Sequence, residues 1–244
     1  MIDWLRTSQA DPVIELGDVV LPIAIRRHAR ARRMTMRLAP DGSEVRVTMP
    51  RWGQTRDALV FAQARRDWLA QQLAKVPQAA PIQPGAGIAY RGNTLTLEWS
   101  DSARRKPSLA GSSLAIGGPL EGLDRRVQRW LEGEAVRLME DDLAFYCGRA
   151  GHAAPAFRLS RAQRRWGSCS GQGTRARCIR VNWRLVQAPD HVRRSVVAHE
   201  VAHLTHFDHS PSFHAHLAGL FEGEIAMADS WLKQNGRTLY ATFG

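Results

Sequence analysis

The stretch Val196-Val-Ala-His-Glu-Val-Ala-His-Leu-Thr-His-Phe-Asp-His209 is the one from which the rest of the chain is best interpreted. It contains the pattern H-E-x-x-H, in which His199 and His203 bracket Glu200. Residues four apart lie on one face of an α-helix, so the two imidazoles can hold a single ion between them. Glu200 is rotated from His199 by about 100° around the helix axis. It therefore lies beside the ion without ligating it, as a general base for a metal-activated water must.

Two imidazoles, a third protein ligand and one open position make up a catalytic zinc site. The sequence therefore predicts a zinc-dependent hydrolase, and above all a metallopeptidase that cleaves peptide bonds through a zinc-bound water activated by Glu200. Because H-E-x-x-H also occurs by chance, its surroundings matter. Six of the nine histidines fall between residues 199 and 216, and the motif lies in a helical pattern that buries Val196, Val197, Val201 and Leu204.

The third ligand is expected to be His209, which follows His203 by six residues and can fold back toward the ion from beyond the helix end. His206 is the rival, but its Cα lies about 4.5 Å further along the helix axis than that of His203. Glu222 and Glu224, further downstream, remain alternatives. His214 and His216 are expected on a helix surface, from which either could donate a hydrogen bond to a reaction intermediate.

The composition places the protein among globular chains of one or two domains, with 244 residues, 44% hydrophobic residues and eight tryptophans. The sequence has no apolar run of membrane-spanning length, and its first residues lack the features of a signal peptide. Its three cysteines are odd in number and include no C-x-x-C pair, which is typical of a reducing compartment. We therefore expect a cytoplasmic protein without a membrane partner.

The residue patterns predict an α+β fold in two parts. Residues 1–100 form a β-rich region with one helix: strands within 13–50, a helix over 55–76, and a strand pair around the turn at 91–93. Residues 101–244 form the domain that carries the metal site, with a short strand within 108–118, strands within 157–186 and a small mixed sheet. A long backing helix runs from an N-cap at Asp124 to Cys147.

The metal helix is expected to begin with Asp190 as its N-cap, after Pro189. The pair Ser210-Pro211 has the form of an N-cap followed by a proline at the first helical position, so a second helix starts directly after His209. A last helix is expected over residues 225–234.

The charge is strongly positive, with a formal net charge of +11. Between Asp142 and Asp190 the sequence has nine arginines and no acidic residue. An arginine-rich surface of this kind attracts nucleic acid, nucleotides or acidic peptides. A basic face that is simply solvated would explain the run of arginines equally well. The second basic cluster, Arg26 to Arg33, could contact phosphates, but the favoured interpretation is a loop or strand edge kept soluble by charge.

Four motifs, at matching order and spacing over roughly residues 155–235, resemble the YgjP-like metallopeptidases, relatives of the SprT-like and WLM proteases. They are Arg165-Trp-Gly-Ser-Cys-Ser170, Val181-Asn-Trp-Arg-Leu185, His199-Glu-Val-Ala-His203 and Asp208-His-Ser-x-x-Phe213. The resemblance implies a zincin-like metallopeptidase fold, with His199, His203 and His209 on Zn²⁺ and Glu200 as catalytic base. His214 departs from the family, which usually has tryptophan there. The relation to SprT-like proteases suggests action on proteins near DNA.

Candidates for stabilising a developing oxyanion, together with the metal, are Arg165, Ser168 and His214. The segment around Ser168 also suits an edge strand that could hold an extended peptide substrate by β-addition. Its other interpretation is packing, with Trp166 and Cys169 facing the core and Gly167 and Ser168 facing away. Cys169 is either a thiolate ligand in a resting state or, by preference, a buried thiol.

Two other functions remain open on the sequence. A metal-dependent nucleotide phosphohydrolase would use the arginine-rich stretch to bind phosphates. A DNA-binding module would carry a structural metal, although such a site has no use for a base at Glu200.

Overall fold

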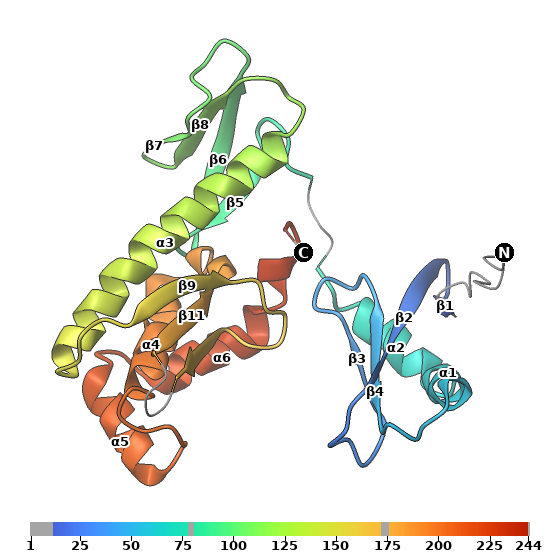
Figure 1. Cartoon of the computed structure of the whole chain (residues 1–244). Coiled ribbons are helices and arrows are strands. Elements are labelled where there is room, and N and C mark those ends of the chain that lie inside the picture. The colour runs from blue at the N-terminus through green and yellow to red at the C-terminus, as the bar shows by residue number, and fades with distance from the viewer. Residues whose placement is uncertain (1–11, 78–80, 172–175, 244) are drawn as a thin grey trace, which may run out of the picture. The chain divides into compact units, whose positions relative to one another are not determined.

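A computed structural model describes residues 12–77, 81–171 and 176–243 (Figure 1). The chain divides into two compact units, of which one contains the described residues 12–77 and the other the described residues from 81 to 243. The strand pair that the sequence analysis assigned to the N-terminal region belongs to the second unit. These strands lie there because they form a sheet with the two strands that follow them in the chain.

The first unit is a four-stranded sheet with two helices. The strands are β1 (Val13–Leu16), β2 (Val19–Arg27), β3 (Thr35–Leu38) and β4 (Val45–Met49), in the order β1-β2-β4-β3. Only β2 and β4 run parallel. The helix predicted over 55–76 is two helices, α1 (Thr55–Gln63) and α2 (Arg66–Leu73). They are separate because Arg65 has φ −120° and ψ 22°, outside the helical region.

The second unit begins with another four-stranded sheet, crossed by the longest helix. Its strands are β5 (Gly87–Tyr90), β6 (Asn93–Ser100), β7 (Ser108–Ala110) and β8 (Ser113–Gly117), in the order β5-β6-β8-β7. Helix α3 (Leu123–Arg149) runs from this sheet to the second half of the unit (Figure 1). One side of this helix is buried and carries Val127, Leu131, Met139 and Leu143.

The rest of the second unit carries the metal-site motifs. A three-stranded sheet contains β9 (Ala156–Ser160), β10 (Gly167–Ser170) and β11 (Cys178–Asn182) in the order β10-β11-β9, so β10 lies at an edge. It is followed by the 3-10 helix η1 (Trp183–Val186), helices α4 (Asp190–Ala202), α5 (Pro211–Leu220) and α6 (Ile225–Asn235), and the 3-10 helix η2 (Thr238–Tyr240).

Two predicted helix starts were wrong by one or two residues. Helix α3 begins at Leu123 after Gly122, whose φ of 69° suits glycine, so Asp124 lies in the first turn. Asp190 is the first residue of α4 rather than its N-cap, because its carboxylate accepts hydrogen bonds from Arg91 and Arg193 instead of capping the helix. The start of α5 is confirmed, with Ser210 Oγ accepting from the Phe213 N–H at 3.4 Å.

A buried ion cluster fixes α4 against α3. The Asp142 carboxylate on α3 is only 3% exposed and accepts hydrogen bonds from Arg193 at 2.7 Å and Arg194 at 2.9 Å, both on α4. Breaking a buried pair of this kind leaves a charge without compensation, so the register of the two helices is strongly specified.

The described part of the chain thus has a mixed α+β fold with three small mixed sheets. None of its helices combines the length and the apolar character that crossing a bilayer requires.

Candidate metal centre

The predicted ligands His199 and His203 lie at the C-terminal end of α4, where His203 is the C-cap residue. The opposite side of this helix carries Val197 and Val201, which are fully buried, whereas Val196 is half-buried. The hydrophobic face therefore turns the two imidazoles away from the core. His209 reaches them from the segment between α4 and α5, as expected from its spacing.

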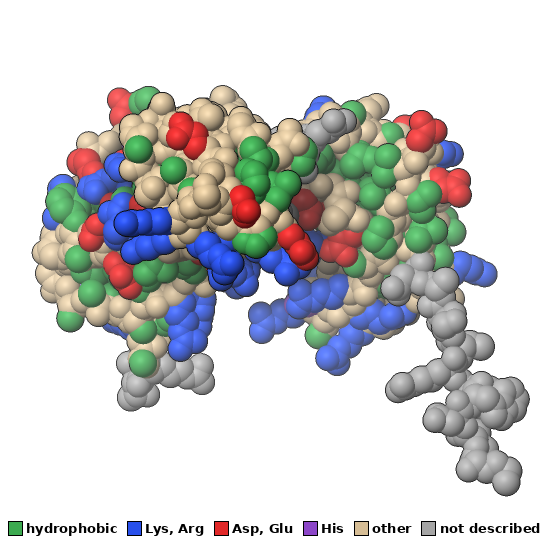
Figure 2. All heavy atoms as spheres, turned by 90° about the horizontal axis from the view of Figure 1, so that it is seen from above, with side chains coloured by type: hydrophobic (Ala, Val, Ile, Leu, Met, Phe, Trp, Pro, Cys, Tyr) green, Lys and Arg blue, Asp and Glu red, His purple; other side chains and the backbone are tan. Residues whose placement is uncertain are grey.

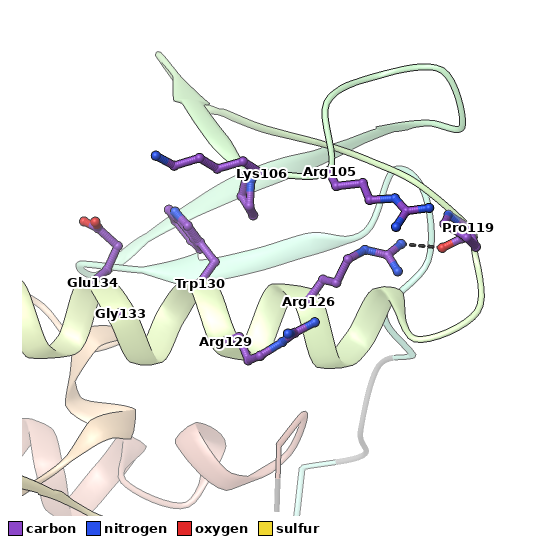
Figure 3. A pocket seen from close by; sticks show the side chains of 9 residues that line it. Arg105, Lys106, Pro119, Arg126, Arg129, Trp130, Gly133 and Glu134 are labelled. Atoms are coloured by element: carbon purple, nitrogen blue, oxygen red, sulfur yellow. Dashed lines mark hydrogen bonds between the residues drawn. The ribbon is translucent and has the colours of Figure 1, made fainter.

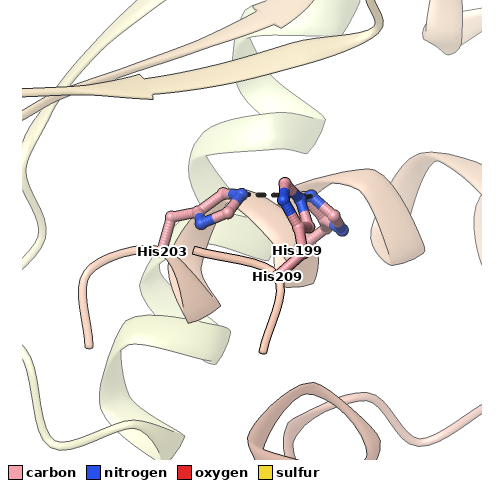
Figure 4. A group of neighbouring side chains, drawn as sticks. All are labelled: His199, His203 and His209. Atoms are coloured by element: carbon pink, nitrogen blue, oxygen red, sulfur yellow. Dashed lines mark hydrogen bonds between the residues drawn. The ribbon is translucent and has the colours of Figure 1, made fainter. Parts of the chain in front are cut away.

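Three imidazoles converge at this point (Figure 4). The Nε2 atom of His199 lies 3.2 Å from Nε2 of His203 and 3.2 Å from Nε2 of His209. Nitrogen ligands placed tetrahedrally at the Zn–N distance would be about 3.3 Å apart. The two distances from His199 match those between ligands of a zinc coordination tetrahedron, and all three histidines offer a ligand atom within 4.8 Å of one another, so the group can hold a metal ion.

The ring of His203 is oriented by the backbone of His206. Nδ1 of His203 lies 2.9 Å from the His206 carbonyl oxygen. A carbonyl can only accept, so Nδ1 carries the proton and Nε2 presents its lone pair to the centre of the group. His206, the rival for third ligand, thus contributes its carbonyl, while its ring lies 5.5 Å from that of His216.

Phe213 packs against all three rings. It is fully buried on α5, and its ring centroid lies 5.0 Å from that of His199, 4.6 Å from His203 and 4.9 Å from His209. The aromatic ring closes one side of the group to water and restricts the imidazoles to one arrangement. Burial, with help from the neighbouring histidines, lowers the pKa of His199 to about 4, so its ring is neutral and able to bind a cation at neutral pH.

Glu200 is buried beside these histidines, with only 5% of the residue exposed. Burial raises the pKa of its carboxyl to about 7, against the opposing effects of the Cys169 backbone N–H and Arg165. Its Oε2 atom has no hydrogen-bond partner within the described part of the chain. A buried carboxylate oxygen without a partner is costly in a structural role and is suited to a group that exchanges protons.

Gly167 provides the space for Glu200. A Cβ atom at residue 167 would lie 2.3 Å from Glu200 Oε1 and 2.7 Å from its Cδ. Strand β10 therefore passes directly over the carboxylate. The sequence analysis did not assign Gly167 a role, and the signal available was its place inside the Arg-Trp-Gly-Ser motif.

The prediction that Trp166 and Cys169 pack against the core is confirmed, whereas Gly167, which was expected to face away, lies against Glu200. Gly167 and Cys169 share the side toward α4, as side chains two apart on a strand must. Trp166 precedes the strand and packs against Tyr240 at 5.5 Å. Burial raises the pKa of the Cys169 thiol, and its sulfur is not part of the histidine group.

The three proposed oxyanion residues lie in different places. Arg165 is near enough to Glu200 to lower its pKa, and the His214 ring lies 6.5 Å from that of His209. Ser168 alternates with Gly167, so its side chain points to the other face of the sheet. The structure therefore brings Arg165 and His214 to the site, but not the hydroxyl of Ser168.

The carboxylates considered as third ligands are not in the group. Glu222 accepts a hydrogen bond from Tyr146 at 2.6 Å and another from Arg194 at 2.7 Å. Glu224 directly precedes α6 and is exposed. Neither belongs to the group of three histidines.

The arginines of residues 143–189 do not form one free basic face. Arg184 is buried and donates to the Phe243 carbonyl, Arg161 pairs with Glu132 at 2.7 Å, and Arg177 donates to the Leu204 carbonyl at 2.6 Å. Arg175 lies outside the described residues. Several of these positive charges serve to hold loops and the C-terminal segment in place.

Comparison with protein families gives one match. The family model described as YgjP-like, metallopeptidase domain, matches residues 32–235, which include every residue of the histidine group. No curated protein and no solved structure matches the chain.

Proposed function

The chain belongs to the YgjP-like metallopeptidase domain family, and from that premise we propose that it is a zinc-dependent peptidase. His199, His203 and His209 would hold the ion, and Glu200 would act as general base. The observation that supports this proposal is the convergence of three imidazoles, with Nε2 of His199 3.2 Å from Nε2 of both His203 and His209, next to a buried carboxylate that has an oxygen without a hydrogen-bond partner in the described part of the chain.

The donor set fits zinc. Three neutral imidazoles are the ligands of several catalytic zinc sites, and they leave the positive charge of the ion undiminished. When bound, zinc would supply Lewis acidity, polarising a carbonyl and lowering the pKa of water to about 7. The His203–His206 contact and the packing of Phe213 support the ligand orientation that this chemistry requires.

Glu200 would move the proton. A base whose pKa is near 7 accepts a proton from the attacking water at neutral pH and can return it to the leaving amine. The proton it carries is shielded from bulk solvent by β10 and Gly167. Arg165 and His214 are the residues we propose for stabilising negative charge on the carbonyl oxygen.

The substrate would be a protein or peptide in an extended conformation. Strand β10 lies at the edge of its sheet and passes over Glu200, so its outer backbone groups can pair with a substrate strand. Backbone pairing would place a carbonyl of the peptide along the edge of β10, next to the metal centre. It would leave the preference for particular substrate side chains broad. We place the enzyme in the cytoplasm, since its three cysteines are unpaired.

The alternative functions have less support. The phosphohydrolase hypothesis rests on the arginines of residues 143–189, several of which are engaged in structural contacts. A purely structural metal would give Glu200 no reason to be buried without a partner for Oε2.

The test is to supply purified protein with zinc and measure two reactions side by side, the cleavage of casein or a peptide library and the release of phosphate from nucleoside triphosphates. We expect peptide cleavage that a chelator abolishes and added zinc restores. Phosphate release without any peptide cleavage would overturn the proposal in favour of a phosphohydrolase.

A further inference from the structure

A pocket of about 800 Å³ opens beside the first turns of α3, in the second unit (Figure 3). Its walls come from the loop between β6 and β7, the loop between β8 and α3, and one face of α3. None of the residues of the histidine group or its neighbours on β10 lines it. The pocket is therefore a different site from the metal centre.

Four basic side chains face this pocket, and only one acidic side chain does. Arg105 and Lys106 come from the loop, and Arg126 and Arg129 from the helix. The acidic residue, Glu134, already accepts hydrogen bonds from Tyr90 and Arg137. In the described part of the chain none of the four basic residues forms an ion pair, so the pocket has an uncompensated positive potential.

Arg126 is held in place by the protein rather than by a counter-charge. Its guanidinium donates to the carbonyl oxygens of Glu121, at 3.1 Å, and Pro119. Its Nε is buried and has no hydrogen-bond partner among the described residues. Arg105 is placed by close packing against Gly118, since a Cβ there would lie 2.9 Å from Arg105 Cγ. The guanidinium of Arg126 is thus fixed before any ligand arrives, which reduces the entropy lost on binding.

The floor of the pocket offers a flat aromatic surface. Trp130 is half-buried and packs against Tyr90 with ring centroids 5.1 Å apart. Gly133, one turn further along α3, has nothing within 4 Å of the position of a Cβ atom. Glycine is unfavourable inside a helix, and here no neighbour requires it. Its effect is to leave open space beside the indole, where a planar ring can approach.

Phosphate contacts and a stacking surface together define the ligand chemistry. Guanidinium groups bind phosphate oxygens, and tryptophan stacks on bases of any sequence. A pocket of this volume is of the size that holds one small ligand or one segment of a chain. The neighbouring residues Arg104 and Arg125 are also exposed, so positive charge continues beyond the pocket. Figure 2, which looks onto the end of the second unit with this sheet, shows lysine and arginine side chains gathered there.

We propose that this pocket binds single-stranded nucleic acid, with backbone phosphates on Arg105, Lys106, Arg126 and Arg129 and one base against Trp130. A single strand is required because bases in a duplex are stacked on each other and cannot reach the indole. The site is independent of the proposed peptidase activity. It would hold the protein on a strand whether or not the metal centre is occupied.

The experiment is fluorescence anisotropy of a labelled oligothymidylate with the full chain. Two double variants are compared, R105E/R129E in the pocket and R158E/K233E, which makes the same change in net charge at exposed positions elsewhere in the second unit. We expect the pocket variant to bind at least about tenfold more weakly, with a salt slope shallower by about 0.7 for each phosphate that the variant no longer neutralises. The control should bind like wild type. If both double variants bind the oligonucleotide equally more weakly than wild type, only net charge matters and the proposal is overturned.

Further measurements test whether a nucleic-acid base stacks on Trp130 and which class of ligand the pocket binds. Trp130→Leu keeps an apolar side chain against Tyr90 and should weaken binding about tenfold, through loss of stacking. An abasic oligonucleotide should bind wild type correspondingly less well, and Glu200→Gln should bind normally. The proposal is overturned if Trp130→Leu and wild type bind alike with unchanged circular dichroism. It is also overturned if duplex DNA, polyglutamate or a mononucleotide displaces the oligonucleotide as effectively as an unlabelled single strand.

Discussion

The α-carbon of Gly167 lies against the carboxylate of Glu200, so close that a Cβ at residue 167 would come within 2.3 Å of Oε1. This contact joins the edge strand β10 to the metal helix α4. It places the backbone that would hold a substrate directly over the group that would move the proton. In the proposed peptidase, the absence of a single methyl group would thereby set the distance between substrate and base.

Gly167→Ala should therefore abolish most of the activity without removing the metal. The added methyl group must displace either a buried carboxylate or the strand, and misplacement of catalytic groups by about 1 Å costs on the order of 100-fold in rate. The measurement is kcat for peptide cleavage together with zinc content. Gly148→Ala is the matched control, since nothing lies within 4 Å of a Cβ there. Full activity in Gly167→Ala would show that Glu200 does not depend on this contact.

Glu200→Gln should reduce the cleavage rate by about 100- to 10,000-fold, the usual contribution of a general base. The amide has nearly the same shape but cannot accept the proton of the attacking water, so zinc binding should be unchanged. Glu140→Gln, an exposed position on α3, serves as control. If the two variants cleave peptide at the same rate, Glu200 is not the base.

Phe213→Ala should weaken both the fold and the metal site. Removing a fully buried phenylalanine costs about 3–5 kcal/mol in unfolding free energy. Because the ring contacts all three imidazoles, we expect zinc affinity to fall by about 10- to 100-fold, as for other groups that orient ligands. Urea denaturation and chelator competition measure the two effects. Phe145→Ala, at a side chain that is 45% exposed, should lose far less of either.

The pH dependence of stability should show the contribution of Glu134. Hydrogen bonds from Arg137, and to a lesser extent from Tyr90, hold the pKa of this carboxyl below its ordinary value of 4.5 although burial opposes them. A lowered folded-state pKa means that the stabilisation is complete above 4.5 and is lost as the pH falls through the folded-state pKa. Urea midpoints between pH 6 and pH 3 should thus fall more steeply for wild type than for Glu134→Gln. Parallel curves would contradict this assignment.

The local patterns of the sequence predicted most of the elements around the metal site. Ser210-Pro211 fixed the start of α5, and the four-residue spacing of His199 and His203 placed both imidazoles on one side of α4, because these features depend on neighbours in the chain. The position of His209 beyond the helix end followed from the same local reasoning. These predictions needed no knowledge of the tertiary structure.

What the sequence did not show depends on contacts between distant segments. Asp190 was expected to cap a helix. Its carboxylate instead accepts a hydrogen bond from Arg91, which comes from the β5–β6 hairpin. Gly167 was expected to face away from the core, but it lies against Glu200, a residue 33 positions further along the chain. The role of Gly167 and the pocket beside Trp130 arise only when strands and helices pack, so neither could be read from spacing.

The central claim is that three histidines bind one metal ion, and its most direct test is the zinc content of purified wild type, His203→Ala, His209→Ala and His214→Ala by elemental analysis. We predict about one zinc per chain in wild type and in His214→Ala, as for a mononuclear site with three protein ligands. We predict little or none in His203→Ala and His209→Ala, with all four proteins folded by circular dichroism. Wild type without zinc, or zinc retained in full by His209→Ala, would contradict the metal centre described here.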